Sequence, residues 1–138
     1  MNTFKNIAIG DSIYILRGFK NNDNIYESEI INATITNYRR DEDDILYINI
    51  TYLNDKKAIF SILNEDVVPA RAFIPMNLIP DSGDYDEICD VFIDENDALQ
   101  SVKDQYEFHI KCIQKHIEKL NKREILYKKL LERWEKRF

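Results

Sequence analysis

The stretch ESEIINATITNYRRDEDDILYINITYLN, residues 27–54, decides the fold. In its opening part Ile31, Ala33 and Ile35 fall on one side of an extended chain, while Asn and Thr side chains fall on the other. This alternation with a period of two, rich in β-branched residues, predicts a strand over 27–38. Its Asn and Thr side is expected to face water.

The strand pattern continues on both sides of that segment. The charged run RRDEDD predicts a hairpin tip at 39–44, and residues 45–54 predict the returning strand. Flanking strands are expected at 12–18, followed by a polar turn at 19–24, and at 58–63. The short polar connections leave no room for helical crossovers, which favours an antiparallel meander. We therefore expect an α+β protein with a small antiparallel SH3-like β-barrel; a curled sheet packed on a helix is the alternative.

A proline-rich segment follows the predicted meander. Residues 64–81 contain all three prolines, which predicts that neither a regular helix nor a central strand runs through them. The apolar residues of this segment suggest that it wraps over the barrel and plugs an open end. Residues 82–90 are expected to form an acidic loop, and 91–93 to form a last short strand. This organisation predicts a barrel domain over residues 1–93.

The remainder, residues 94–138, predicts one long helix. Asp94 can cap its N-terminus, and no Gly or Pro interrupts the chain beyond it. At 1.5 Å per residue the helix would be about 66 Å long. A break is the alternative, because Asn121 followed by Glu124 imitates a capping box. Every seventh residue is apolar, and apolar companions occur at adjacent helical offsets: Leu99, Tyr106, Ile113, Leu120, Tyr127 and Trp134, with Val102, Ile110, Ile117, Leu130, Leu131 and Phe138.

Charge divides the chain in the same way. Residues 1–100 hold 8 basic and 19 acidic side chains, a net charge of −11, whereas residues 101–138 hold 11 basic and 6 acidic, a net charge of +5. An acidic body and a basic tail can each attract an oppositely charged partner. The chain has two cysteines, no signal-peptide pattern at its start and no segment apolar enough to span a bilayer. We therefore expect an intracellular location, in the cytoplasm of a bacterial host, or a virion, and no membrane partner.

Two groups of residues invite a metal-site interpretation. His109, Cys112 and His116 share one side of the predicted helix, but the two histidines would lie roughly 10 Å apart along its axis. One ion would then hold only a neighbouring pair and would need a further ligand, such as Cys89. Residues 81–87, DSGDYDE, have the carboxylate density of a calcium loop without the order of an EF-hand. We expect no metal and no cofactor, although cation binding by the acidic loop stays open.

The chain carries no motif typical of an enzyme. Nucleophile elbows, phosphate-cradling glycine loops and dinucleotide-binding fingerprints are all absent from the sequence. Nucleic acid is disfavoured as a partner, because the body is strongly acidic and glutamates interrupt the basic tail at helical spacing. We expect a protein without catalytic activity.

The last part of the tail is the candidate interaction site. Large apolar and aromatic side chains of the type that dominates protein interfaces gather near its end, and exposing them without a partner is unfavourable. We expect this part of the helix to contact another protein or a second copy of the chain. The predicted interface residues are Leu120, Tyr127, Leu130, Leu131, Trp134 and Phe138.

Two short patterns resemble small proteins of bacteriophages and prophages. Residues 9–14, IGDSIY, are similar to the strand start of their SH3-like barrels, and residues 91–98, VFIDENDA, to the junction that begins their C-terminal helix. The resemblance implies a phage-related origin more than an activity. Our leading hypothesis is a non-catalytic structural or adaptor protein, such as a virion component, that docks on neighbouring subunits. The alternative is an intracellular regulatory binder: a nucleic-acid-associated barrel or an acidic inhibitor of a host protein.

Overall fold

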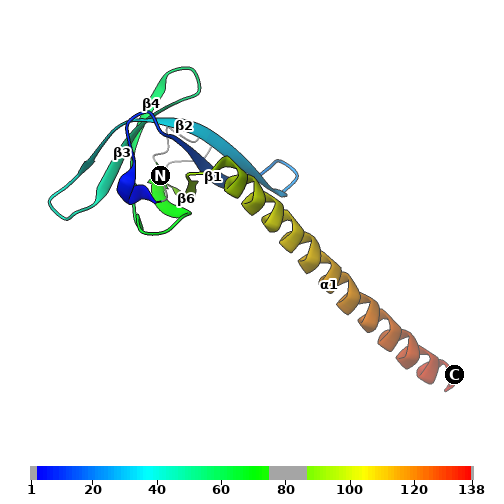
Figure 1. Cartoon of the computed structure of the whole chain (residues 1–138). Helices are drawn as coiled ribbons and strands as arrows, with labels where there is room; N and C mark the ends of the chain where they lie inside the picture. Colours follow the sequence, from blue (N-terminus) through cyan, green and yellow to red (C-terminus); the bar gives the residue numbers. More distant parts are fainter. Residues whose placement is uncertain (1–2, 75–86, 138) are drawn as a thin grey trace. The chain divides into compact units, whose positions relative to one another are not determined.

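A computed structural model describes residues 3–74 and 87–137, which form a closed β-barrel followed by a long helix (Figure 1). The six strands follow one another around the barrel in chain order, and each pairs antiparallel with its neighbours, β6 closing on β1. The small antiparallel barrel and the C-terminal helix predicted from the sequence are thereby confirmed. The elements are η1 (Phe4–Asn6), β1 (Ser12–Lys20), β2 (Tyr26–Arg40), β3 (Leu46–Tyr52), β4 (Lys56–Ile62), β5 (Ala70–Ile74), β6 (Glu87–Phe92) and α1 (Glu95–Glu135).

The barrel core follows from the period-two alternation. In β3 the side chains of Leu46, Ile48 and Ile50 are buried, and the residues between them point outward. The same holds for Ile31, Ala33 and Ile35 of β2, as predicted. Because the sheet closes on itself, each of the six strands pairs with a neighbour on both sides, although the β1–β6 and β4–β5 ladders are short. Closure of this kind limits the free strand edge that could template aggregation.

Two hairpin turns are built by the same local device. In the β1–β2 turn the Asn21 side-chain oxygen accepts hydrogen bonds from the backbone N–H groups of Asp23 and Ile25, at 2.9 and 3.1 Å. In the β2–β3 turn the Asp41 carboxylate accepts the corresponding bonds from residues 43 and 45, both at 2.9 Å. Asn and Asp favour such turns because their short side chains mimic a backbone acceptor. Both turns lie at the sites predicted from sequence. Strand β1 ends two residues later than expected, and β2 begins one residue earlier and ends two residues later.

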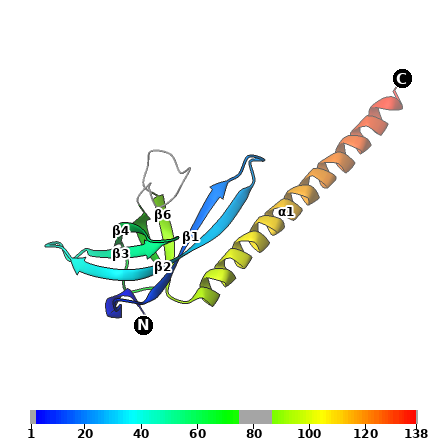
Figure 2. The same cartoon turned by 90° about the horizontal axis from the view of Figure 1, so that it is seen from above.

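Strand β2 is long enough to pair with β1 along one part and with β3 along another (Figure 2). A bulge between Ile35 and Asn37 shifts the register with β3. The Thr36 hydroxyl donates a hydrogen bond to the Asn49 carbonyl oxygen at 3.2 Å across this bulge. The bulge thus bends β2 around the barrel while a side chain supplies a polar contact at the irregular position.

The structure corrects the prediction for the proline-rich segment. Residues 70–74 form β5, a full member of the barrel wall between β4 and β6, where a central strand had been excluded. Its inner face carries Ala70, Ala72 and Ile74, all completely buried. Pro69 precedes the strand and Pro75 follows it, so neither interrupts the ladder. The part of the proposed wrapping segment beyond Ile74 lies outside the described residues.

The acidic-loop prediction is also corrected for its second half. Strand β6 begins at Glu87, four residues before the expected start, and pairs with both β5 and β1. Cys89 lies opposite Ala72 on the inner side of the wall and is buried in the core, so it does not belong to a loop. The remaining acidic residues, 81–86, lie outside the described part of the chain.

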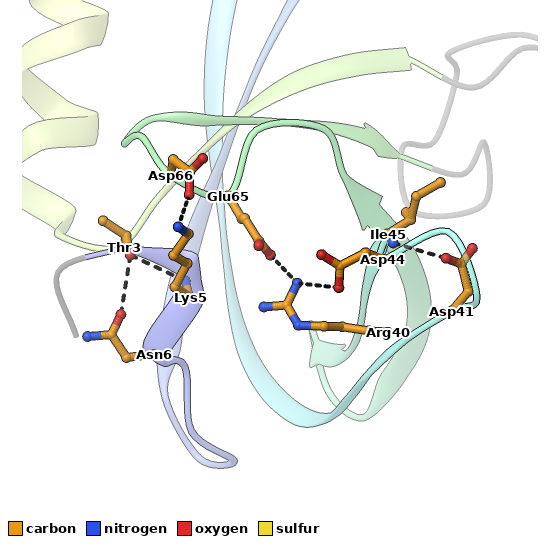
Figure 3. A network of polar contacts seen from close by, with 9 residues as sticks. All are labelled: Thr3, Lys5, Asn6, Arg40, Asp41, Asp44, Ile45, Glu65 and Asp66. Carbon is orange, nitrogen blue, oxygen red and sulfur yellow. Dashed lines mark hydrogen bonds and ion pairs between the residues drawn. The ribbon is translucent and has the colours of Figure 1, made fainter.

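An N-terminal segment without a periodic sequence pattern completes the core. Phe4, in the single-turn helix η1, is fully buried, and Ile7 packs in the same cluster. The Thr3 hydroxyl caps this turn by accepting a hydrogen bond from the Lys5 backbone N–H at 3.3 Å. Lys5 in turn forms an ion pair with Asp66 at 2.6 Å (Figure 3). The hydrogen bond and charge of Asp66 raise the pKa of the Lys5 amine above its ordinary value.

A neighbouring ion pair connects the end of β2 with the segment after β4. The Arg40 guanidinium contacts the Glu65 carboxylate and also approaches Asp44 to 3.9 Å (Figure 3). The Glu65 hydrogen bond raises the pKa of Arg40. Exposed pairs of this kind contribute at most about 1 kcal/mol each, so the barrel depends mainly on its apolar core. Burial in that core raises the pKa of the Tyr52 hydroxyl.

Helix α1 begins as the sequence predicts. The Asp94 carboxylate accepts a hydrogen bond from the Asn96 backbone N–H at 2.8 Å, and Glu95 and Asp97 occupy the first turn. The helix runs without interruption through Asn121, so the alternative of a break at that residue is not seen. The chain divides into two compact units: residues 1–100, with the barrel and the start of α1, and residues 101–138, with the rest of α1. Within residues 3–74 and 87–137, no helix is long and apolar enough to cross a lipid bilayer.

Candidate protein-interaction surface

The second unit presents an apolar row along α1 that we call the helix seam. Its members recur at alternating intervals of four and three residues, which is the heptad spacing of positions a and d. From Tyr106 to Trp134 the pattern spans four heptads. Glu124 is the single charged residue in the row. The helix seam consists of Tyr106, Ile110, Ile113, Ile117, Leu120, Glu124, Tyr127, Leu131 and Trp134.

The predicted interface residues fall on or beside this row. Leu120, Tyr127, Leu131 and Trp134 belong to the helix seam, whereas Leu130 flanks it. These five side chains are between 42% and 71% exposed. The sixth predicted residue, Phe138, lies outside the described residues. The structure thus describes five of the six side chains as accessible on one continuous helix, which is the condition for their use in binding.

The helix seam extends further toward the N-terminus than the predicted interface. Tyr106, Ile110, Ile113 and Ile117 lie on the same side of α1 and are also exposed. The seven-residue repeat of these side chains is visible in the sequence. The predicted interface, however, includes only residues from Leu120 onward, where aromatic side chains are frequent. Other exposed apolar residues, such as Phe108, do not share the heptad spacing. Scattered apolar residues of that kind are ordinary on protein surfaces, whereas a continuous row is not.

Charged side chains surround the helix seam in an ordered way. Lys115, Lys122, Lys129 and Lys136 recur every seventh residue and occupy the side of the helix opposite the seam. Next to the seam, the Lys128 amine pairs with the Glu124 carboxylate at 2.7 Å. This pair, at positions i and i+4, follows from the helical spacing of glutamates and lysines in the tail. The helix seam and this row of lysines therefore lie on different faces of α1.

The end of α1 combines both kinds of contact. The Arg137 guanidinium lies over the Trp134 ring, 4.6 Å from the ring centroid, yet Trp134 keeps about half of its surface exposed. Tryptophan and arginine are the residue types most enriched among interface hot spots. The planar pair is suited to protein contact, because it offers a large apolar surface with a charged rim.

The possible metal ligands are not brought together. His109, Cys112 and His116 are exposed on α1, while Cys89 is buried in the barrel. Among residues 3–74 and 87–137 no three His, Cys, Asp or Glu side chains are placed to share an ion. The acidic residues 81–86 are not among these.

One buried charge in the barrel has a structural explanation. Arg17 of β1 is buried, lies opposite Glu29 of β2 in the register, and pairs with its carboxylate at 2.9 Å. Its guanidinium also lies 5.0 Å from the centroid of the Phe19 ring. Buried cations need such partners to offset the loss of hydration. Arg17 therefore has partners on its own two strands and is not assigned to a binding site.

Comparison of this chain with protein-family profiles, with curated proteins and with solved structures finds no match. What is shown is the fold alone, a six-stranded antiparallel barrel followed by one long helix, without a link to phage proteins.

Proposed function

We propose that this protein is a non-catalytic structural or adaptor protein that binds another protein through the helix seam. The observation that carries this proposal is the continuous row of exposed apolar side chains on an unbroken helix. The barrel forms the folded body of the protein, and the helix seam forms the surface that binds the partner. The resemblance of residues 9–14 and 91–98 to phage proteins adds the finer proposal that the assembly is a virion.

The energetic basis of the proposal is the apolar side-chain area of the helix seam that stays in contact with water. Removing apolar surface from water contributes about 25 cal/mol per Å², and aromatic residues supply the largest areas. Tyr106, Tyr127 and Trp134 divide the helix seam into segments, each with aliphatic residues between the rings. Such a row resembles the anchor residues of helices that bind in grooves or against other helices.

A shortened chain tests the proposal. Removing residues 121–138 deletes Tyr127, Leu131 and Trp134 from the helix seam while leaving the barrel strands intact. We expect the full chain, purified from its native source with a tag on the barrel, to elute in a complex of fixed stoichiometry. The shortened chain should elute without that partner and keep the near-ultraviolet circular dichroism of the barrel tyrosines. Retention of the same complex by a folded shortened chain would contradict the proposal.

A further inference from the structure

We infer that the helix seam is covered by the helix seam of a second copy, in a parallel two-stranded coiled coil. This inference rests on the proposed function, because it names the partner of the same surface. The row is self-complementary: Ile110, Ile117, Glu124 and Leu131 occupy a positions, and Tyr106, Ile113, Leu120, Tyr127 and Trp134 occupy d positions.

The spacing itself selects a helical partner. A straight helix has 3.6 residues per turn, so a row with a strict period of 3.5 drifts around its surface unless two helices supercoil. Knobs-into-holes packing then needs a second helix of the same period and similar length. Among the described residues, α1 is the only α-helix. A second copy of α1 meets both requirements over the four heptads between Tyr106 and Trp134.

Charge complementarity at Glu124 supports the parallel, in-register arrangement. In that arrangement a side chain at position a inserts between residues of the partner that include the preceding g position. Here the g residue is Arg123, so each Glu124 would lie between Arg123 of the second copy and its own Lys128, already 2.7 Å away. A polar residue at one a position commonly sets register and chain number at some cost in stability.

The remaining positions agree with a two-stranded coil. Ile110 and Ile117 at a, with Leu120 at d, are the combination that favours two parallel strands, and Ile113 at d departs from it. The lysines at every seventh residue from Lys115 occupy the outermost position and stay hydrated in the pair. The net charge of +5 on residues 101–138 opposes close approach of two copies. Association should therefore strengthen as salt screens this repulsion, in contrast to binding of the helix to an acidic surface.

Disulfide trapping in the full chain tests both partner and orientation. With Cys112 replaced by serine, we compare Leu120→Cys, on the seam at position d, with Lys122→Cys, on the outer face. In a parallel in-register coil the two copies of residue 120 face each other within disulfide reach, whereas the two copies of residue 122 point apart. In a glutathione redox buffer the fraction of L120C chains in intermolecular disulfides should exceed that of K122C at least tenfold. Equal trapping of the two variants would overturn the inference.

Sedimentation equilibrium of the same preparations separates this inference from the proposed function. A dimer that traps L120C supports the coiled coil. A dimer in which L120C fails to cross-link overturns the parallel register. A monomer with a water-exposed Trp134, shown by its fluorescence, overturns self-association but leaves docking on a different protein. A monomer in which Trp134 is sheltered overturns both, because no apolar seam then remains to be covered.

Discussion

Ile117→Glu is expected to weaken association of the full chain at least a hundredfold. Ile117 lies near the centre of the helix seam at position a, so each dimer would bury two new carboxylates next to each other. A buried unpaired charge is among the most unfavourable changes at an interface. A hundredfold loss corresponds to about 2.7 kcal/mol, and dilution followed by sedimentation velocity measures it directly.

The chain offers a closely matched control for this substitution. Ile125→Glu makes the same chemical change on the same helix, and the two isoleucines are similarly exposed, 49% for Ile117 and 54% for Ile125. Because Ile125 lies outside the helix seam, its replacement should leave the dissociation constant within about threefold of the original. An equal loss for both variants would show that helix hydrophobicity in general, not the seam, drives association.

Phe4→Ala is expected to lower the free energy of unfolding of the barrel by about 3–5 kcal/mol. Phe4 is 0% exposed and belongs to the core cluster together with residues from the strands. Its removal leaves a cavity that a closed barrel cannot easily collapse. Because a domain is stable by only about 5–15 kcal/mol in total, this variant should unfold at much lower urea concentration.

A second phenylalanine provides the control for this prediction. Phe73 of β5 is 43% exposed, so Phe73→Ala should cost about 1 kcal/mol or less. The single tryptophan lies in α1, so unfolding is best followed by near-ultraviolet circular dichroism of the barrel tyrosines at a fixed protein concentration. If the two substitutions cost the same, η1 is not part of the barrel core.

The strands with clear alternation were predictable from sequence alone. In β2 and β3, apolar side chains at every second residue face the core, and the Asn and Asp turns between strands occur where composition indicates them. The helix was equally clear, because Asp94 caps it and no Gly or Pro interrupts it. In these elements local conformational preference and tertiary burial favour the same conformation. The sequence pattern alone is therefore enough to predict them.

Two barrel elements escaped prediction for physical reasons. Strand β5 lies between Pro69 and Pro75, and the interval of five residues is an ordinary strand length. Pro69 precedes the strand, where its missing N–H is not needed by the ladder. In the N-terminal segment, Phe4 of η1 and Ile7 just after η1 reach the core, and two apolar residues carry no period. Both elements depend on contacts with distant strands that a local pattern does not contain.

The candidate site was predicted in part for the same reason. The seven-residue repeat from Leu99 onward indicated which side of the helix is apolar, and Trp134 and its neighbours were identified as an interface. The extension of the seam back to Tyr106 follows only when the helix is seen to be unbroken and those side chains to be exposed. Exposure is a property of the folded chain and cannot be derived from a helical period.

The most direct test of this account is sedimentation equilibrium of the unmodified full chain, with Trp134 fluorescence recorded over the same dilution series. The chain has a mass of 16.4 kDa and a single tryptophan, so mass and local environment report on the same event. We predict twice the chain mass at high concentration and a red shift of the emission as the dimer dissociates. A mass of 16.4 kDa at every concentration, with the emission of a buried indole throughout, would contradict the claim that another molecule covers the helix seam.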